Sequence, residues 1–287
     1  MFLVTDAAGH VGKAVIAELA NHSVAVRVIG QDPAELLAAP PNVEIVRCNP
    51  ADEMSLQQAL QGVEAVLLAC PYTPQITEGQ MRLVAAAKRA GVARLVQLSG
   101  VGANAEMCCA RMLRWFGEAE ASVAASGLKV TRLRPTMQMQ MLLEFAPSIA
   151  QQGLIAGPFR STRWTWVDAR DVAAVAVAAL RDASHADQTY IVTGAESVSY
   201  HDVAERLGGV LGKSIRYTDI TANEARGWLQ AKGVPPVMIE AKLELWDACA
   251  SNLINVAPTN VVREVTGREP RSLEDFATDY RTSFGSL

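Results

Sequence analysis

A glycine-bearing turn connects the first apolar segment of the chain to its first helical pattern. Phe2 to Thr5 reads as a buried strand, and the turn that follows has glycines at positions 9 and 12. In a strand–turn–helix unit, a G-x-x-G-x-x-G turn places the pyrophosphate of a dinucleotide on the helix N-terminus. Gly9 would let the backbone approach the phosphates, and Gly12 would let the helix pack closely against the strand. The pattern predicts a dinucleotide site, and the alternative is an ordinary turn that binds nothing.

Asp6 occupies the position of the first glycine in this pattern. A carboxylate ~5 Å from a phosphate at an effective dielectric of ~20 is repelled by about 3 kcal/mol, which is roughly two decades in affinity. A side chain turned away from the phosphates would lose less. We therefore expect Asp6 to weaken cofactor binding.

The end of the second predicted strand should contact the adenosine ribose. An acidic residue there binds the 2′-hydroxyl of NAD, and an arginine binds the 2′-phosphate of NADP. The corresponding segment is Ile29-Gly30-Gln31-Asp32-Pro33, in which Gln31 is neutral and Asp32 is the nearest acid. We expect NADPH or NADH as cofactor with little preference, while a simple turn over Gly30 to Pro33 remains the alternative.

The elements that must position these residues alternate between strands and helices in the first half of the chain. The strands are expected at residues 2–5, 24–29, 43–47, 64–70, 94–99 and 128–132, and the helices at 10–21, 52–61, 77–90 and 107–126. The strands are rich in Val, Leu and Ile without polar alternation, which is typical of burial on both faces. The pattern predicts an α/β fold with a doubly wound parallel sheet.

The second half is predominantly helical, with helices expected at residues 169–181, 200–211, 222–231 and 236–250 and short strands at 164–167 and 190–193. No linker rich in Gly, Ser or Pro separates the halves. We expect a dinucleotide-binding core at residues 1–153 and a smaller, mainly helical substrate-binding subdomain at 154–287. Segments at about 165–195 are expected to return to the core.

Composition excludes several classes of protein. The 287 residues are 50% hydrophobic and carry a net charge of −4, which argues against disorder and against a nucleic acid or membrane-surface partner. No apolar run approaches the ~20 residues of a membrane span. The Met1 to Thr5 start has no basic segment of a signal peptide. The five cysteines indicate free thiols in the cytoplasm, and neither cysteines nor histidines have metal-ligand spacing.

Several segments in order resemble the NmrA-like branch of the atypical short-chain dehydrogenases/reductases. These are the opening strand and loop, Gly91 to Ser99, Ser126 to Pro135, the segment Trp166-Val-Asp-Ala-Arg-Asp171, and Thr266 to Phe276. The resemblance covers nearly the whole chain and implies a Rossmann-type fold. It places Gln31 where the family usually has arginine, and Asn49 where it usually has an adenine-contacting aspartate. The cofactor-binding residues it implies are Asp6, Gly9, His10, Val11, Gly12, Gln31, Asn49, Cys70, Pro71, Ser99 and Pro135.

The resemblance also places Met112 and Phe116 at the positions of the Tyr and Lys of the usual Tyr-x-x-x-Lys pair. Neither side chain transfers a proton, so no catalytic residue is assigned. Direct hydride transfer to a quinone, imine or dye needs less from the protein, because the acceptor is already electrophilic and the cofactor supplies the chemistry.

The expected substrate pocket combines aromatic, thioether and basic side chains. Flexible methionines suit an adaptable apolar pocket. For each of these residues, ordinary packing is the alternative, and Asp168 and Asp171 are expected to cap a helix rather than to catalyse. The predicted pocket residues are Tyr72, Arg111, Met112, Trp115, Phe116, Met137, Met139 and Trp164.

Two functions are consistent with these residues. The first is an NAD(P)H-dependent reductase of a cyclic, conjugated small molecule (quinone-, imine- or polyketide-like). The second is a degenerate scaffold that binds NAD(P)H weakly or not at all and acts as a sensor, a small-molecule binder or a catalyst of cyclisation or dehydration. In both cases a small molecule is the partner, and a homodimer is the assembly considered.

Overall fold

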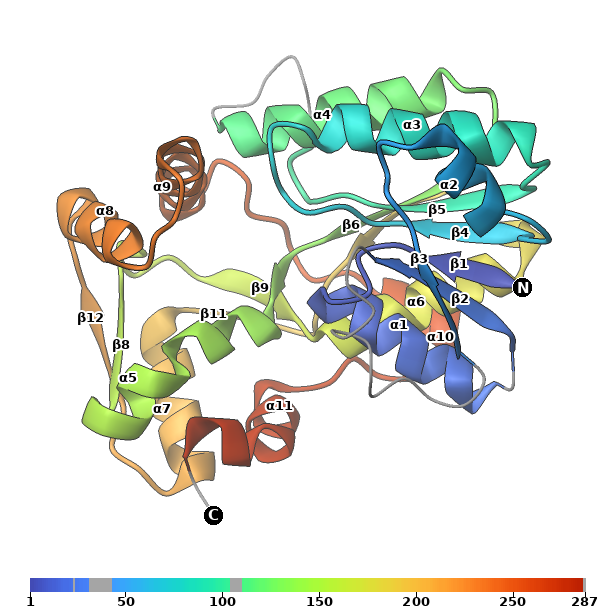
Figure 1. Cartoon of the computed structure of the whole chain (residues 1–287). Helices are drawn as coiled ribbons and strands as arrows, with labels where there is room; N and C mark the ends of the chain where they lie inside the picture. Colours follow the sequence, from blue (N-terminus) through green and yellow to red (C-terminus); the bar gives the residue numbers. More distant parts are fainter. Residues whose placement is uncertain (23, 31–42, 104–109, 286–287) are drawn as a thin grey trace.

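The computed structural model describes residues 1–22, 24–30, 43–103 and 110–285. Its centre is a parallel sheet of seven strands in the order β10-β6-β5-β4-β1-β2-β3 (Figure 1). The strands are β1 (Phe2–Val4), β2 (Val26–Gly30), β3 (Val43–Arg47), β4 (Ala65–Leu68), β5 (Arg94–Leu98), β6 (Lys129–Pro135) and β10 (Thr189–Val192). The sequence prediction of a doubly wound parallel sheet is confirmed.

Helices cover both faces of this sheet (Figure 1). One face carries α1 (His10–Asn21), α6 (Ala169–Arg181) and α10 (Val261–Thr266), and the other carries α2 (Glu53–Ala59), α3 (Ile76–Arg89) and α4 (Arg111–Ala124). Successive strand residues therefore enter different cores: Val4 and Val96 pack toward α1 and α6, whereas Leu3 and Leu95 pack toward α2 and α3. Burial on both faces explains the absence of polar alternation in the strands.

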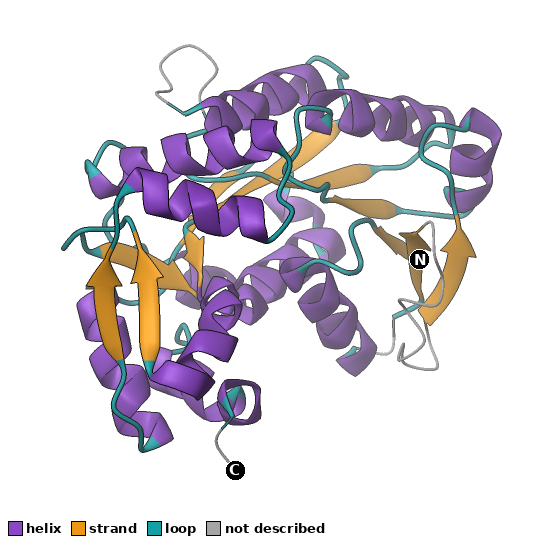
Figure 2. Ribbon diagram, turned by 60° about the vertical axis from the view of Figure 1, so that its left-hand side comes forward, coloured by secondary structure: helices purple, strands orange, loops and turns teal. Residues whose placement is uncertain are grey.

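A smaller lobe lies beyond the carboxyl ends of the strands (Figure 2). It contains a three-stranded sheet of β11 (Ser197–Val198), β9 (Trp164–Val167) and β7 (Met137–Gln138), and a pair of β12 (Arg216–Asp219) with β8 (Leu154–Gly157). Its helices are α5 (Ala146–Gln152), α7 (Tyr200–Leu211), α8 (Ala222–Ala231), α9 (Pro236–Ala250) and α11 (Leu273–Asp279), and 3-10 turns occupy Met139–Phe145 and Arg281–Phe284. A third 3-10 turn, Ala183–His185, packs against α6 and β6 in the core.

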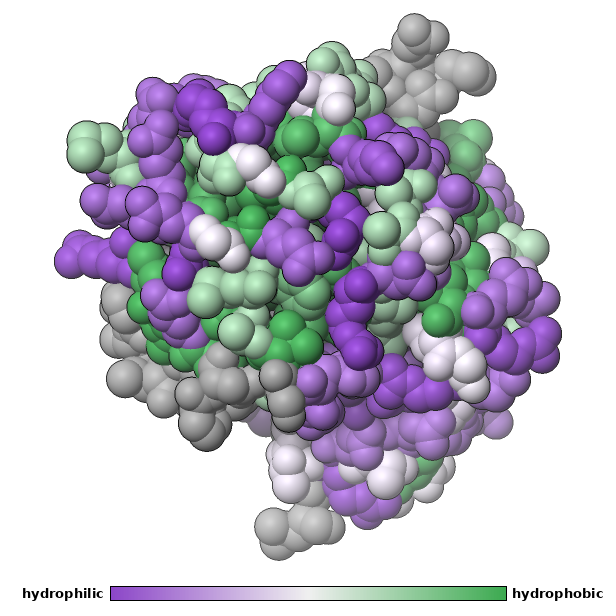
Figure 3. All heavy atoms as spheres, turned by 90° about the vertical axis from the view of Figure 1, so that its right-hand side faces the viewer, coloured by the Kyte–Doolittle hydropathy of each residue, from purple (hydrophilic) through white to green (hydrophobic). Residues whose placement is uncertain are grey.

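The lobe has its own aromatic core. The ring of Phe159 stacks on that of Tyr200 with centroids 4.0 Å apart, and Trp164 and Trp166 are both buried beside them. The chain does not divide cleanly between the core and the lobe, because α6, β10 and α10 pack in the core although they follow β9 in sequence. Figure 3 shows the surface on the right-hand side of Figure 1, near the beginning of β1. Hydrophilic and hydrophobic side chains are mixed on this surface.

The observed boundaries agree with the predicted elements to within a few residues. The helix expected at 107–126 begins at Arg111 in the structure, and its first predicted turn lies partly outside the described residues. In the described part of the chain, no helix is long and apolar enough to cross a membrane.

Candidate active site

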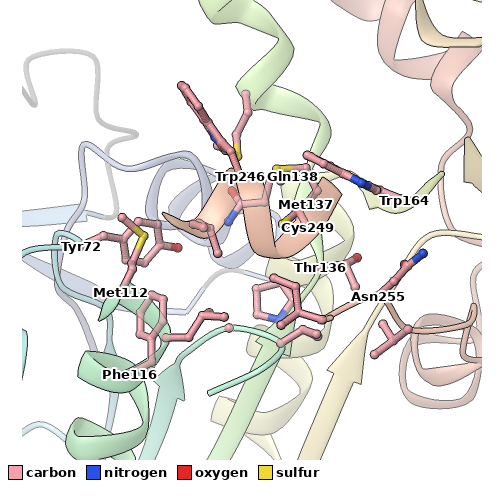
Figure 4. A pocket seen from close by; sticks show the side chains of 18 of the residues that line it. Tyr72, Met112, Phe116, Thr136, Met137, Gln138, Trp164, Trp246, Cys249 and Asn255 are labelled. Carbon is pink, nitrogen blue, oxygen red and sulfur yellow. The ribbon is translucent and has the colours of Figure 1, made fainter. Parts of the chain in front are cut away.

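An apolar cavity of ≈ 320 Å³ lies between the sheet and the lobe; we call it the substrate cavity (Figure 4). The floor comes from the carboxyl ends of β5 and β6, represented by Ser99 and Pro135. Met112 and Phe116 of α4 form one wall, and Trp164 of β9 lines the cavity from the lobe. The carboxyl ends of parallel strands are where ligands bind in open α/β sheets, so this position suits a substrate.

A second cavity of ≈ 310 Å³ lies at the carboxyl ends of β1, β2 and β4; we call it the nucleotide cavity. Asp6, Gly30 and Cys48 line it, together with Cys70 and Pro71. It lies beside the loop that leads into α1, whose N-cap residue is Gly9. The exposed amides of a helix N-terminus attract phosphate, so the adenosine half of a dinucleotide would fit this cavity.

The loop between β1 and α1 is tightly folded around Asp6. The φ of Asp6 is +50°, in the left-handed region where glycine is favoured, and its carbonyl accepts a hydrogen bond from the Gly9 N–H at 2.9 Å. A Cβ on Gly12 would lie 2.2 Å from the same carbonyl oxygen. The helix can approach the strand this closely because residue 12 is glycine.

The side chain of Asp6 lies over Gly9. A Cβ on Gly9 would be only 2.5 Å from Asp6 Oδ2, so the carboxylate covers the backbone that phosphates would otherwise approach. Burial in this loop raises the pKa of the Asp6 carboxyl above its ordinary value. The Asp6 carboxylate therefore lies against Gly9, in the loop where the sequence predicts the phosphate site.

Thr5 anchors this loop to the neighbouring strand. Its Oγ1 donates to the Leu67 carbonyl at 3.0 Å and accepts from the Ala69 N–H at 2.8 Å, and Thr5 is buried. The end of β1 is thus fixed to the end of β4 immediately before the turn. Sequence reasoning missed this role, since a threonine at the end of a strand has no distinctive signal.

Cys70 and Tyr72 extend from the end of β4 toward Asp6. Desolvation by neighbouring side chains, and next the negative charge of Asp6, raise the pKa of both Cys70 and Tyr72 to about 12, although 39% of the Tyr72 surface is exposed. Cys70 is consequently a protonated thiol at neutral pH and not a nucleophile. The Tyr72 ring meets the edge of Phe116 with centroids 4.9 Å apart, at the wall of the substrate cavity.

The predicted pocket residues fall into two groups. Tyr72, Met112, Phe116, Met137 and Trp164 line the substrate cavity. Arg111, Trp115 and Met139 are not among the lining residues. Arg111 is held by a bidentate ion pair with Glu244, and Met139 packs in the aromatic core of the lobe.

The predicted cofactor residues are also divided. Asp6, Cys70 and Pro71 line the nucleotide cavity, whereas Ser99 and Pro135 line the substrate cavity. His10, Val11 and Gly12 begin α1, directly after Gly9. The Asn49 side chain accepts from the Ala51 N–H at 3.0 Å and so shapes the turn after β3. Gln31 lies outside the described residues.

Asp168 and Asp171 have structural roles at the start of α6. Asp168 accepts from the Arg170 N–H at 2.8 Å as the N-cap, and Gln140 donates to its carboxylate at 2.8 Å. Asp171 is paired with Arg271. The capping prediction is confirmed for Asp168 and was wrong for Asp171, whose carboxylate is bound by Arg271 instead.

Sequence reasoning did not find the contribution of α9 to the substrate cavity. Its cavity-facing residues are Met238, Lys242, Leu245, Trp246 and Cys249, followed by Ile254, Asn255 and Val256 after the helix. Their helical spacing was a visible signal, but an apolar helix face is equally consistent with packing. Within the described residues, no three His, Cys, Asp or Glu side chains are grouped to hold a metal ion.

The parallel sheet and the two cavities at its strand ends define an α/β protein of the doubly wound, dinucleotide-binding class. The model of the NmrA-like family matches residues 1–276, so the chain belongs to the NmrA-like family. It is 32% identical over 289 residues to the NAD(P)H azoreductase of Xenophilus azovorans, with 100% of both chains covered. It is 36% identical over 287 residues to a Streptomyces griseus (4-alkanoyl-5-oxo-2,5-dihydrofuran-3-yl)methyl phosphate reductase, with 99% of each covered.

The fold is also that of a solved quinone oxidoreductase. The NADPH-dependent quinone oxidoreductase of Escherichia coli, in complex with NADPH, superposes with a TM-score of 0.85 and 22% identity, covering 97% of this chain and 99% of that chain. The resemblance predicted from the sequence is confirmed, and the chain is an oxidoreductase of this family.

Proposed function

We propose that the chain is an NAD(P)H-dependent reductase that delivers a hydride to a cyclic, conjugated small molecule in the substrate cavity. The observation that carries this proposal is the placement of the two cavities. They open at neighbouring strand ends of one parallel sheet, and the segment after β4 contributes to both, with Cys70 in the nucleotide cavity and Tyr72 in the substrate cavity. A dinucleotide that binds its adenosine in the nucleotide cavity would extend its nicotinamide toward Ser99 and Pro135. The reductase relatives support the same activity.

The residues present fit such a cofactor with one exception. Gly9 and Gly12 lack the side chains that would block the loop, and the N-terminus of α1 is available to phosphate. The exception is the Asp6 carboxylate, which must move or be protonated when the pyrophosphate binds. Bound NAD(P)H would supply the hydride. A quinone or azo acceptor also takes up one proton from the solvent, whereas an iminium ion takes the hydride alone.

The chain itself binds, orients and shields the substrate. Apolar side chains dominate the cavity wall and exclude water from the reacting atoms. Tyr72 remains protonated at neutral pH because its pKa is about 12, and the Gln138 amide donates a hydrogen bond to its hydroxyl oxygen, which opposes the rise in pKa. We propose that this hydroxyl donates a hydrogen bond to the substrate heteroatom that gains charge during hydride transfer.

The test is anaerobic oxidation of NADH and NADPH in the presence of a naphthoquinone, an azo dye or a cyclic iminium ion. We expect turnover of at least one of these acceptors. Tyr72→Phe should lower kcat by about tenfold or more while cofactor affinity stays unchanged. Cofactor binding without reduction of any acceptor would contradict the proposal.

One observation favours the second candidate function, a scaffold with little or no cofactor binding. The Asp6 carboxylate covers Gly9, where the pyrophosphate should lie. If wild-type protein binds neither NADH nor NADPH at millimolar concentration but binds quinone-like compounds, a sensor or a non-redox catalyst is the better conclusion. Titration of both nucleotides against tryptophan fluorescence distinguishes the two functions.

We further propose that the protein acts in the cytoplasm on this small molecule, with neither nucleic acid nor membrane as a partner. Its net charge of −4 supports this, because both partners attract basic proteins. A homodimer is the assembly we propose, and light scattering in solution tests it.

A further inference from the structure

Lys242 lies on the face of α9 that lines the substrate cavity. The other lining residues of this helix are Met238, Leu245, Trp246 and Cys249, which lie three to seven positions away on the same face. Lys242 is half-buried, and its Nζ lies 5.9 Å from the centroid of the Trp246 ring. Among the described residues that line this cavity, Lys242 is the one with a formal charge. A helix face built only for packing would carry an apolar residue here.

The acidic residues of α9 do not neutralise this lysine. Each of them is paired with an arginine from another element: Glu240 with Arg226, Glu244 with Arg111, and Asp247 with Arg160. The residues one turn away from Lys242 in either direction are apolar. Within the described part of the chain, the structure gives the Lys242 ammonium no carboxylate partner. Its positive charge is therefore available to a ligand in the cavity.

The remaining polar groups of the cavity cannot replace this charge. Gln138, Asn255 and Tyr72 are neutral, and most of the lining is apolar. An anionic group that enters an apolar cavity must be paired, because an unpaired charge loses its hydration without compensation. A lysine ammonium on a flexible stem pairs with sulfonate, phosphate or carboxylate as a point charge.

We propose that Lys242 is a specificity-determining residue that binds an anionic substituent of the substrate. The substrate class is then a planar, conjugated, mostly apolar body that carries a sulfonate, phosphate or carboxylate group. This inference rests on the proposed function for the reaction, but not for the binding of the anion. Because this contact would be made to the anionic substituent and not to the atoms that react, the effect of Lys242 should lie in KM and in equilibrium affinity.

The experiment compares two acceptors, naphthoquinone and its ring-sulfonated analogue, in wild type, Lys242→Met and Lys242→Arg. We expect Lys242→Met to lower kcat/KM for the sulfonated quinone by about tenfold through KM, equivalent to about 1.4 kcal/mol. For the neutral quinone, the same substitution should lower kcat/KM by no more than about twofold, a loss at least fivefold smaller than that for the sulfonated quinone. Lys242→Arg should retain most of the preference for the sulfonated over the neutral quinone. Added salt should reduce this preference in wild type.

Lys232 provides a matched control. Its Nζ lies 3.8 Å from the centroid of the Trp228 ring on α8, and it does not line the substrate cavity. Lys232→Met removes the same charge from the protein, so it reports any effect of net charge alone. We expect Lys232→Met to leave kcat/KM for both quinones unchanged.

An equilibrium measurement separates this inference from the proposed function. Anilinonaphthalene sulfonate, an anionic aromatic fluorophore, should bind wild type and Lys232→Met equally and Lys242→Met about tenfold more weakly. If neither quinone is reduced, the reductase proposal fails, and this binding measurement still decides the role of Lys242. Equal losses for neutral and sulfonated quinones, or equal affinity of the fluorophore for Lys242→Met and wild type, would overturn the inference.

Discussion

At the scale of single residues, Asp6 determines whether the loop before α1 is a good cofactor site. Its backbone has the left-handed conformation that the family fills with glycine, and its carboxylate lies over Gly9. Aspartate tolerates this conformation better than most residues, so the turn is preserved while the phosphate site acquires a negative charge. The shape and the charge of residue 6 can therefore be tested separately.

We expect Asp6→Gly to raise the affinity for NAD(P)H by at least tenfold. The substitution removes the repulsion between the carboxylate and the pyrophosphate and uncovers the backbone at Gly9. Asp6→Asn should recover only the electrostatic part, because the amide keeps the volume of the side chain. Fluorescence titration with both nucleotides measures the two effects.

Two results would refute this explanation of Asp6. Wild type that already binds at micromolar affinity, with no gain in Asp6→Gly, would show that the carboxylate leaves the loop when the cofactor binds. Loss of a measured activity in Asp6→Gly, despite better cofactor binding, would instead make Asp6 a functional residue and favour the non-redox function.

The raised pKa of Asp6 predicts that NADH affinity depends on pH. The pyrophosphate disfavours the ionised carboxylate, so binding raises the Asp6 pKa further and takes up a proton. Affinity should be highest below the pKa of the free protein, fall as pH rises toward the pKa of the complex, and then level off. NADH is the suitable ligand since it lacks the titrating 2′-phosphate. A slope that is the same in Asp6→Asn would assign the proton to another group.

We expect the affinities for NADH and NADPH to differ by less than about a hundredfold, which corresponds to about 2.7 kcal/mol of binding free energy. Gln31 has neither a carboxylate nor a guanidinium, and Arg27 cannot replace it. Arg27 is buried, with hydrogen bonds to Glu44 and to the carbonyl oxygens of Ala59 and Gln61. A stronger preference for NADPH that disappears in Arg47→Gln would identify Arg47, an exposed neighbour of Gly30 across β2 and β3, as the contact to the 2′-phosphate.

At the scale of elements, the sequence was most informative where burial enforces a pattern. Strands such as Ala65–Leu68 and Arg94–Leu98 are apolar because helices cover both faces, and that pattern is visible without a structure. The first wall of the substrate cavity was also predictable, because Met112 and Phe116 follow β5 closely in the family pattern.

The contribution of α9 was not predictable in the same way. Lys242 follows Tyr72 by 170 positions, and only the path of the chain through the lobe brings both to one cavity. A lysine on a helix usually lies on its solvated face, so nothing in the sequence around Lys242 distinguishes it from an ordinary surface residue. Arg111 shows the reverse case, because this basic residue was predicted to line the pocket and instead forms an ion pair with Glu244.

The pair of Asp171 and Arg271 joins α6 of the core to the segment that enters α11. Asp171 is 2% exposed, and the Arg271 N–H donates to its Oδ2 at 2.7 Å. Arg271→Leu should lower the free energy of unfolding by about 3 kcal/mol, because it leaves a buried carboxylate without its partner. The matched control is Arg268→Leu, which breaks the more exposed pair with Glu18 and should cost less than about 1 kcal/mol. Urea denaturation measures both, and equal costs would contradict the argument.

At the scale of the whole molecule, the core and the lobe are connected by several segments. The chain enters the lobe after β6, returns with α6, leaves after β10, returns with α10 and leaves again toward α11. The substrate cavity takes its walls from both parts, with Phe116 on one side and Trp246 on the other. Neither part can unfold without disrupting segments of the other, so the two should behave as one cooperative unit.

We therefore expect unfolding in urea to follow the same curve by tryptophan fluorescence and by far-ultraviolet circular dichroism. The fluorescence reports mainly on the lobe, where Trp164, Trp166 and Trp246 are buried, whereas circular dichroism reports on all helices. NADPH at a hundred times its Kd should add about 2.7 kcal/mol and shift both curves equally, although its adenosine contacts lie in the core. A fluorescence transition at lower urea concentration, with a midpoint that NADPH does not shift, would instead show that the lobe unfolds independently. In that case the substrate cavity would lose its α9 wall while the nucleotide cavity remained intact.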